Sequence, residues 1–369
     1  MKTIELKDIA IIDWGNTSLT KSAFKVNGKY LGVSAAGCDG RMDNAEHQIG
    51  TIVLSAIGAN CGRMFYPCEP FTAIKNTITI TPKENTDSKF LFYYLNNNQI
   101  SSRGAGQPFI TKGDASKKRI PKINYTEQKK IAAILDAADA YRQKTKALIT
   151  KYDELTQSLF LDMFGDQVVK LKKIQFVKLS EVVNNNKIIT YGIVQAGENL
   201  KNGVPYIRTG DIKNGKILIE KLQKTSPEIA KSYERSKCAA GDIVMSIRAT
   251  VGTIAIVPPE LDGVNLTQGT ARISPDTKII DRYFLYYCLK SKDVQLKIEK
   301  QTKGATFREI TLGRLKEIEI PLPSLISQAQ FAERVQAIET QKAQAQASLE
   351  KAEELFNSLL QRAFKGELM

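Results

Sequence analysis

Two long segments of the chain repeat apolar residues at helical spacing. Residues 128–164 contain no glycine or proline, while Pro121 precedes and Gly165 follows them, which are typical start and stop signals of a helix. Apolar or small side chains alternate at steps of three and four, as in a heptad seam. Residues 328–364 repeat the pattern. The predicted seam comprises Ile131, Ile134, Ala138, Tyr141, Leu148, Tyr152, Leu155 and Leu159 in the first helix and Phe331, Val335, Ile338, Leu349, Phe356 and Leu359 in the second.

Outside these helices the pattern changes to short β-rich runs between Gly, Asn and Pro turns. Such runs are TIVLSAIG and NTITITP early in the chain and DIVMSI and TIAIVPP later. The helical runs SKFLFYYLNNNQ and DRYFLYYCLKSKDVQLKIEK follow them. The pattern predicts an α/β (α+β) fold with two mixed domains and two long helices.

The chain also repeats itself. Residues 101–166 and 301–366, aligned at an offset of 200 without gaps, share 17 identities in 66 positions, where about four are expected by chance. GTIVLSAIGANCG resembles GDIVMSIRATVG, and FLFYYL resembles YFLYYCL. We therefore predict a tandem duplication: a variable domain in residues 1–120, a spacer helix in 121–166, a second variable domain in 167–320 and a second spacer helix in 321–369.

The two helices are expected to pack on each other as an antiparallel coiled coil about a pseudo-twofold axis. A lone helix of this length, about 55 Å at 1.5 Å per residue, would leave its apolar stripe in water. The first helix would carry the chain away and the second would bring it back. The alternative is that each helix packs separately on its own domain.

Charge changes this picture by pointing to a polyanionic partner. The 53 basic and 39 acidic residues give a net charge of +14. The two predicted domains carry +5 and +10, whereas the two helical segments carry 0 and −1. Because net charge governs association more than fold, the domains and not the helices are the expected anion-binding parts.

The residue types that are scarce exclude several function classes. His47 is the only histidine, which argues against histidine-based metal sites and most catalytic triads. No phosphate-binding G-x-x-x-x-G-K-[ST], no helix-opening G-x-G-x-x-G and no Asn/Asp-Pro-Pro-aromatic tetrapeptide is present. We expect no catalytic residue, no metal and no cofactor in this chain.

Location follows from two further features. No apolar run is long enough to span a membrane, and MKTIELKDIA is too charged for a signal peptide. Five scattered cysteines without a C-x-x-C pair are typical of reduced thiols. A cytoplasmic protein is expected.

Duplex DNA fits the charge pattern best, because a few Arg, Lys, Asn, Gln and Thr side chains read base edges while other cations hold phosphates. In the second domain the loops YIRTGD, SIRATVG and TKGATFRE combine such residues with glycines, which permit close backbone approach. The candidate DNA-binding residues are Arg208, Thr209, Arg248, Thr250, Lys303, Thr306 and Arg308 in the second domain and Arg41, Asn60, Arg63, Arg103, Gln107 and Lys112 in the first.

The whole arrangement resembles the specificity (S) subunit of a type I restriction–modification enzyme. The resemblance rests on the G-D-I-V-x-S-type strand with its following T-V-G, on KGATFREITLGRLKEIEIPLPSLISQAQFAERV (residues 303–335) and on the tandem order. It implies two recognition domains that each read half of a bipartite, asymmetric DNA sequence. It also implies two methyltransferase (M) subunits and restriction (R) subunits as partners, with S-adenosylmethionine, ATP and Mg²⁺ bound by those partners.

Two other functions fit parts of the pattern. A stand-alone DNA-binding regulator or architectural protein would share the basic domains but bind its sequence without a methyltransferase. An enzyme, either a nuclease or a methyltransferase, would need motifs that this sequence does not display. Neither explains the duplication as well as a two-part reader does.

Overall fold

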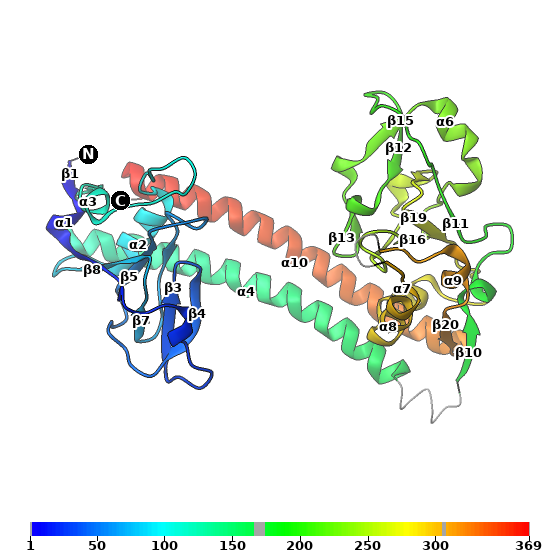
Figure 1. The fold of residues 1–369 in the computed structure, drawn as a ribbon, viewed down its shortest axis with the longest axis horizontal. Coiled ribbons are helices and arrows are strands. Elements are labelled where there is room, and N and C mark those ends of the chain that lie inside the picture. The colour runs from blue at the N-terminus through cyan, green and yellow to red at the C-terminus, as the bar shows by residue number, and fades with distance from the viewer. Residues whose placement is uncertain (1, 166–173, 305–307, 369) are drawn as a thin grey trace. The chain divides into compact units, whose positions relative to one another are not determined.

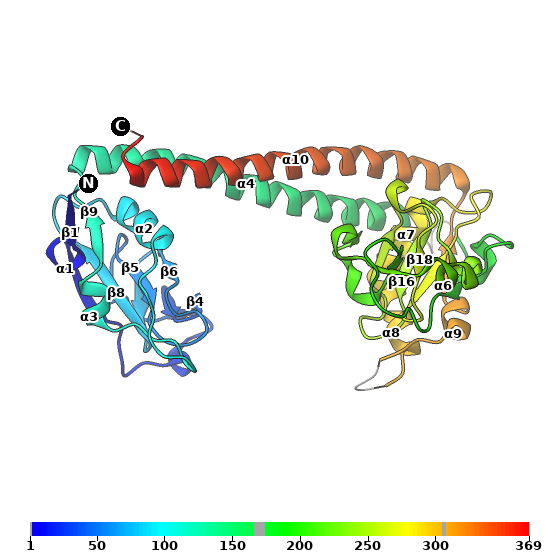
Figure 2. The ribbon, with the colours of Figure 1, turned by 90° about the horizontal axis from the view of Figure 1, so that it is seen from above.

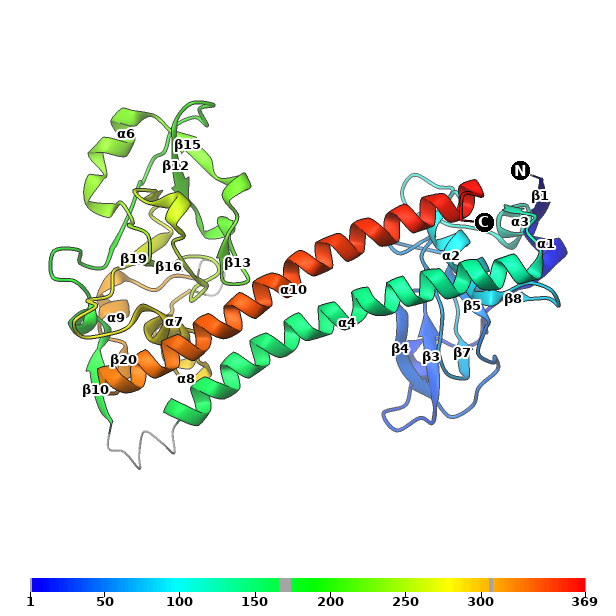
Figure 3. The ribbon, with the colours of Figure 1, turned by 180° about the vertical axis from the view of Figure 1, so that it is seen from behind.

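The computed structural model describes residues 2–165, 174–304 and 308–368. The chain divides into two compact units: unit 1 is Met1–Ala147 with Ala345–Met369, and unit 2 is Leu148–Gln344. Each unit holds one mixed α/β domain, part of the first long helix and part of the second (Figure 1). Both chain termini belong to unit 1 (Figure 3).

The two long helices are α4 (Tyr125–Phe164) and α10 (Leu325–Lys365). Each begins three residues before the start predicted from the sequence, residue 128 or 328, because a polar side chain caps its first turn. The Asn124 side chain accepts a hydrogen bond from the Glu127 N–H at 2.9 Å, and Ser324 accepts one from the Ser327 N–H at 3.3 Å. The predicted pair of long helices is confirmed.

Unit 1 contains two main sheets and a two-stranded ribbon. The strand orders are β2-β8-β5-β6, β4-β3-β7 and β1-β9, and all pairs are antiparallel except β3 with β7. The strands are β1 (Thr3–Glu5), β2 (Ala10–Trp14), β3 (Tyr30–Ser34), β4 (Gly37–Met42), β5 (Ile52–Ser55), β6 (Met64–Phe65), β7 (Phe71–Ala73), β8 (Thr77–Pro82) and β9 (Arg119–Pro121), and the short helices are α1 (Leu6–Ile9), α2 (Ser88–Asn97) and α3 (Lys112–Ser116).

Unit 2 repeats this topology and adds to it. Its sheets are β11-β19-β16-β17, β15-β12-β18 and β10-β20, with a further hairpin β13-β14, and β12 pairs with β18 in parallel as β3 does with β7. The strands are β10 (Gln175–Lys178), β11 (Thr190–Tyr191), β12 (Val204–Ile207), β13 (Ile212–Lys213), β14 (Lys216–Ile217), β15 (Gln223–Thr225), β16 (Ile243–Ser246), β17 (Ile254–Ile256), β18 (Asn265–Leu266), β19 (Thr270–Ile273) and β20 (Glu319–Leu322), and the helices are α6 (Pro227–Ser232), α7 (Arg282–Lys290), α8 (Lys292–Gln301) and α9 (Leu312–Lys316).

Matching strand orders confirm the predicted tandem repeat and the mixed fold class. In each unit the domain lies on one flank of the helices (Figure 2). Two buried aromatic clusters hold these parts together: Phe356 and Leu360 of α10 pack with α2 in unit 1, and Phe160 of α4 packs with α7 and α10 in unit 2. Among the described helices, none is both long and apolar enough to cross a membrane.

The helices pack antiparallel within each unit, as predicted. In unit 1 the Arg142 guanidinium lies 4.2 Å from the Phe356 ring centre, and Lys146 forms an ion pair with Glu353 at 2.8 Å. In unit 2 the rings of Phe160 and Phe331 lie 5.6 Å apart. The alternative, in which each helix packs separately on its own domain, is wrong.

The predicted seam in α4 is partly shifted by one residue. Ile131, Ala138 and Leu159 pack into the cores as predicted, and Tyr152 is half-buried. Four predicted seam positions are exposed: Ile134 (38%), Tyr141 (54%), Leu148 (42%) and Leu155 (51%). Of these, Tyr141 still contacts α10, because its hydroxyl lies 2.7 Å from the Ser348 hydroxyl. The predicted seam of α10 is confirmed for its buried members Phe331, Val335, Leu349 and Phe356, for Leu359, which packs on the core of unit 1, and in part for the half-buried Ile338.

The buried positions of α4 lie one residue later, at Leu135 and Thr156, and Arg142 and Ile149 are half-buried. Apolar residues occupy both phases of the helix, so the apolar pattern alone does not select one. A polar residue of this seam, Thr156, is satisfied within the helix. The hydroxyl of Thr156, which is 1% exposed, donates to the Tyr152 carbonyl at 3.0 Å.

Candidate nucleic-acid interface

Two of the predicted DNA-binding loops of unit 2 lie side by side. We call residues 247–252 L3 and residues 302–310 L5. The Ala249 N–H donates to the Arg308 carbonyl at 3.0 Å, and Arg248 and Glu309 form an antiparallel bridge. The structure therefore brings the candidates Arg248, Thr250, Lys303 and Arg308 onto neighbouring loops. Thr306 lies outside the described residues.

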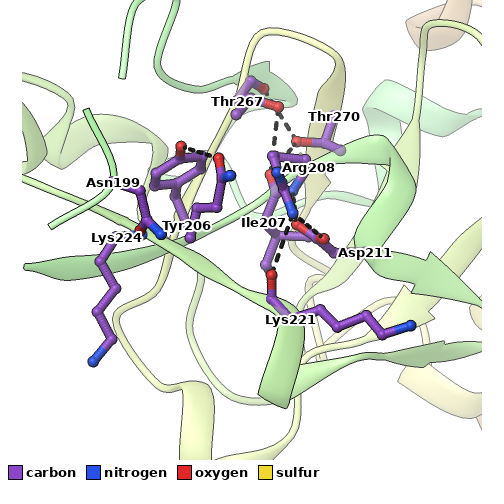
Figure 4. Close-up of polar contacts among 10 residues, drawn as sticks. Asn199, Tyr206, Ile207, Arg208, Asp211, Lys221, Lys224, Thr267 and Thr270 are labelled. Carbon is purple, nitrogen blue, oxygen red and sulfur yellow. Dashed lines mark hydrogen bonds and ion pairs between the residues drawn. The ribbon is translucent and has the colours of Figure 1, made fainter. Parts of the chain in front are cut away.

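The third predicted loop is residues 208–211 (L2). A further loop, which was not predicted from the sequence, connects L2 to L3. That loop, residues 267–269 (L4), connects β18 to β19. Figure 4 shows the hydroxyls of Thr267 and Thr270 directed at the carbonyl of Ile207, at 3.4 and 3.3 Å. A Cβ on Gly269 would lie 2.9 Å from Thr209 Cγ2, so glycine permits this close approach. Thr209 is thus held beside L4.

A fifth loop, residues 192–195 (L1), borders L4 on its other side. Its residue Gly192 lies so close to β18 that an added Cβ would be 2.0 Å from the Leu266 carbonyl oxygen. Unit 1 has equivalents of all five loops: residues 15–20 (L1), 34–37 (L2), 56–62 (L3), 74–76 (L4) and 102–110 (L5).

Five backbone hydrogen bonds between described residues connect the loops in both units, at equivalent positions. In unit 2 they run from Thr267 N–H to Ile207 O (3.0 Å), Gln268 N–H to Ile193 O (2.8 Å), Ile247 N–H to Gly269 O (2.8 Å), Ala249 N–H to Arg308 O (3.0 Å) and Ile310 N–H to Ile247 O (3.0 Å). In unit 1 they run from Ile74 N–H to Val33 O (2.9 Å), Lys75 N–H to Leu19 O (3.0 Å), Ala56 N–H to Asn76 O (2.9 Å), Gly58 N–H to Pro108 O (2.9 Å) and Ile110 N–H to Ala56 O (2.8 Å).

The framework is shared, but its side chains differ. Positions joined by equivalent bonds carry Arg248 and Ile57 in L3, Gln268 and Lys75 in L4, and Arg308 and Pro108 in L5. Backbone bonds fix the loops, whereas side chains carry chemical selectivity. This is the arrangement expected of two readers with one architecture and different targets.

Arg208 is held inside unit 2 rather than left free. Its Nε and Nη2 donate to the two carboxylate oxygens of Asp211 at 2.9 and 2.8 Å, and Nη2 also donates to the Lys221 carbonyl at 3.2 Å (Figure 4). The hydrogen bonds with Asp211, which is 2% exposed, raise the pKa of Arg208. Its role as a DNA contact stays a prediction, and the structure gives it a second role in fixing L2.

The other candidate arginines of unit 2 also have carboxylate partners, but these pairs are open to solvent. Arg248 Nη2 lies 3.0 Å from Glu309, and Arg308 pairs with Glu299 of α8. All four side chains are 42–59% exposed. Such surface pairs contribute little stability, so DNA phosphates could replace them at low cost. Lys303 is exposed.

Unit 1 places some of its candidates within the framework and others outside it. Asn60 of L3 accepts a hydrogen bond from Arg63 at 3.1 Å, and Arg103 of L5 pairs with Asp114. Gln107 of L5 is exposed. Three candidates lie outside the five loops: Arg63, which directly follows L3, Arg41 on β4, ion-paired with Glu69, and Lys112 at the start of α3, ion-paired with Asp13.

L4 and L1 were missed because neither contains arginine, and L4 in addition lies between the buried strands β18 and β19. The sequence nevertheless contained a signal for each of these two loops. Aligning residues 77–82 (TITITP) with 270–275 (TARISP) gives an offset of 193, which pairs Lys75 with Gln268. An aromatic residue followed by glycine also opens L1 in both copies, as Trp14-Gly15 and Tyr191-Gly192.

A buried glutamine attaches each domain to its long helix. In unit 1 the Gln128 side chain donates to the Ile123 carbonyl at 2.8 Å and accepts from the Asp87 N–H at 2.8 Å, at the start of α2. Gln328 does the same in unit 2 with Pro323 and Asp281. The loops are therefore presented from domains that are tied to the helices at fixed points.

A second contact between domain and helix is a tyrosine–carboxylate hydrogen bond. Tyr93 donates to Asp136 at 2.6 Å in unit 1, and Tyr287 donates to Glu339 at 2.9 Å in unit 2. Burial raises the pKa of both phenols, and the neighbouring carboxylates raise it further. Over the described ranges, no group of three or more His, Cys, Asp or Glu side chains is placed to hold a metal ion.

The duplicated domains thus present different side chains on one loop framework. A family model, the type I restriction modification DNA specificity domain, matches residues 1–155 and 172–354. The chain belongs to this family of specificity subunits, which are DNA-recognition components and not enzymes.

Individual relatives agree with this assignment. The specificity subunit of the type I restriction enzyme EcoBI from Escherichia coli is 28% identical over 332 residues, which cover 81% of this chain and 70% of that subunit. The MjaVIII specificity subunit of Methanocaldococcus jannaschii is 25% identical, covering 84% of this chain and 77% of that one. The crystal structure of the S subunit from M. genitalium has the same fold, with a TM-score of 0.67 at 20% identity, covering 98% of this chain and 96% of that one.

Proposed function

We propose that this chain reads a bipartite, asymmetric DNA sequence, with one half-site bound by the loop framework of each unit. It would also dock two methyltransferase subunits and, in the full complex, restriction subunits. The alternative of a stand-alone regulator shares the DNA-reading part but has no such partners.

The observation that carries the proposal is the shared loop framework with its different side chains. Base edges in the major groove present distinct patterns of donors and acceptors, so a change of side chain on a fixed loop changes the sequence that is read. Two copies with different side chains therefore suit two different half-sites. A twofold-symmetric dimer, in contrast, would read the same sequence twice.

Charge and helix length support this role. The surplus of +15 lies in residues 1–120 and 167–320, the parts of the chain that carry the loops, and the helical segments are close to neutral. An α-helix of 40 residues, such as α4, is about 60 Å long. The helices would set the separation of the half-sites without themselves attracting DNA.

Cofactors would belong to the partners. S-adenosylmethionine would bind the methyltransferase subunits, and ATP with Mg²⁺ would serve the restriction subunits. Because its DNA and partners are intracellular, we place the protein in the cytoplasm.

The test exchanges residues 1–120 for the corresponding block of another specificity subunit and maps the methylated bases made by the assembled complex. The exchange should change one half of the methylated sequence and leave the other half and the gap unaltered. A change in both halves, or in neither, would contradict a modular reader. Recovery of the tagged chain without methyltransferase subunits, but with sequence-specific DNA binding, would favour the regulator instead.

A further inference from the structure

L4 is the central loop of the framework in both units. In unit 2 it receives the Ile247 N–H from L3 and donates to Ile193 in L1 and to Ile207 before L2. The next threonine closes the turn in each copy: Thr270 donates to the Thr267 carbonyl at 3.1 Å, and Thr77 donates to the Ile74 carbonyl at 2.6 Å. The backbone on which the middle residue of L4 stands is therefore fixed on several sides.

That middle residue is Gln268 in unit 2 and Lys75 in unit 1. Their backbone N–H groups make equivalent bonds to L1, at 2.8 and 3.0 Å. Gln268 is half-buried and Lys75 is exposed. The side chain of neither forms a hydrogen bond or ion pair with any residue that the structure describes.

This freedom distinguishes them from the arginines of the same surface. Arg208, Arg248 and Arg308 all have carboxylate partners, which already engage some of their donors. Gln268 and Lys75 keep all of their side-chain donors unengaged. The fixed backbone of L4 positions these donors, so they can contact a base edge without breaking an internal bond.

The surroundings of Lys75 fit this use. An open hollow of about 340 Å³ lies against L4 in unit 1, and Lys75 lines it together with Thr20 of L1, the neighbouring Lys21, Ser34 of L2 and Asn60 of L3. Donor-bearing side chains from four parts of the framework thus border one depression. Lys21 pairs with Asp39, whereas Lys75 is uncommitted.

We propose that Lys75 and Gln268 are specificity-determining residues, each selecting one base pair in its own half-site. The inference rests on the proposed reading of one half-site per unit. A lysine ammonium only donates and matches the O6 and N7 acceptors of guanine, whereas a glutamine amide both donates and accepts and matches N6 and N7 of adenine. Lys75 therefore selects guanine and Gln268 selects adenine.

The experiment selects bound sequences from a randomised duplex library with the assembled complex, using wild type and the exchanges Lys75→Gln and Gln268→Lys. Lys75→Gln should turn one guanine of one half-site into adenine, and Gln268→Lys should turn one adenine of the other half-site into guanine. Lys75→Ala and Gln268→Ala should only relax those positions. The preference for the original base should fall about 5- to 150-fold.

Matched controls are Lys25→Gln in unit 1 and Gln175→Ala in unit 2, both exposed and outside the five loops. They should retain the wild-type sequence. If wild type selects two half-sites and both L4 exchanges retain them unchanged, or weaken all sequences equally, the assignment of Lys75 and Gln268 is wrong while the proposed function stands. If wild type selects no two-part sequence, the proposed function fails and the assignment fails with it.

Discussion

The backbone N–H of Asp281 donates a hydrogen bond of 2.7 Å to the side-chain oxygen of Gln328, joining the first turn of α10 to the start of α7. Gln328 is fully buried, and its amide nitrogen donates to the Pro323 carbonyl at 2.9 Å. Asp281 in turn caps α7 by accepting from the Phe284 N–H. The side chain of Gln328 thus joins α7, a helix of the domain in unit 2, to the long helix α10.

Gln328→Leu should destabilise unit 2 by about 1–3 kcal/mol, because it leaves the Asp281 N–H and the Pro323 carbonyl buried without partners. Urea unfolding would give the loss, and hydrogen exchange would locate it at residues 281–285. Gln336→Ala, at an exposed position of the same helix, is the matched control and should lie within about 0.5 kcal/mol of wild type. Equal effects of the two substitutions would contradict a structural role for Gln328.

The corrected helix seam gives a prediction on adjacent residues. Leu135 is fully buried, whereas Ile134 is 38% exposed. Leu135→Ala should cost about 2–5 kcal/mol of unfolding free energy, because it removes core volume. Ile134→Ala should cost much less. Urea unfolding of the two variants checks the order, and the reverse order would restore the seam predicted from the sequence.

The architecture could be predicted from the sequence because the duplication repeats each weak pattern at a second place in the chain. Matching phrases at offsets of 191 and 200 located the shared strands and helices, and the absence of Gly and Pro over residues 128–164 defined a helix to within three residues. What it could not predict was the phase of the seam. Ile134 and Leu135 are equally apolar, and only packing against α10 and the domain decides between them.

The site was predicted less completely. Charged, glycine-flanked loops identified L2, L3 and L5, but they did not reveal every carboxylate partner of the arginines. Asp211 is three residues from Arg208, whereas Glu309 is 61 residues from Arg248. L4 stayed hidden because its function depends on position between loops and not on composition. Long-range pairing of this kind leaves no local pattern to read.

The single histidine predicts how stability depends on pH. His47 lies 5.2 Å from the Phe71 ring, and burial lowers its pKa below the ordinary value of 6.5. The unfolded chain therefore takes up a proton first as the pH falls, so unfolding becomes easier. Stability should be fully present above about pH 7 and decrease toward about pH 5.

His47→Gln should remove this decrease. Thermal unfolding between pH 7 and 5 measures it for both chains. The hydrogen bond from Lys112 lowers the pKa of Asp13 below its ordinary value of 3.8, so the contribution of this carboxylate is lost at a lower pH than that of His47. A wild-type curve that is flat from pH 7 to 5 would show that the His47 pKa is not lowered.

Arg208 pairs with a buried carboxylate and Arg248 with an exposed one. Removal of each arginine should therefore change the stability of unit 2 by a different amount. Arg208→Ala leaves the carboxylate of Asp211, which is 2% exposed, without its bidentate cation, and should cost about 1–3 kcal/mol. Arg248→Ala breaks a solvent-exposed pair with Glu309 and should change stability by no more than about 0.5 kcal/mol. Arg208→Lys should restore little, because an ammonium cannot reproduce the planar two-point contact.

Thermal unfolding of the three variants, followed by DNA binding compared at equal folded fraction, separates two roles of Arg208: holding L2 and contacting DNA. If Arg208→Ala is as stable as wild type and changes only the bound sequence, Arg208 reads DNA and does not hold L2; if it unfolds earlier and retains the sequence, the arginine serves the loop that presents Thr209.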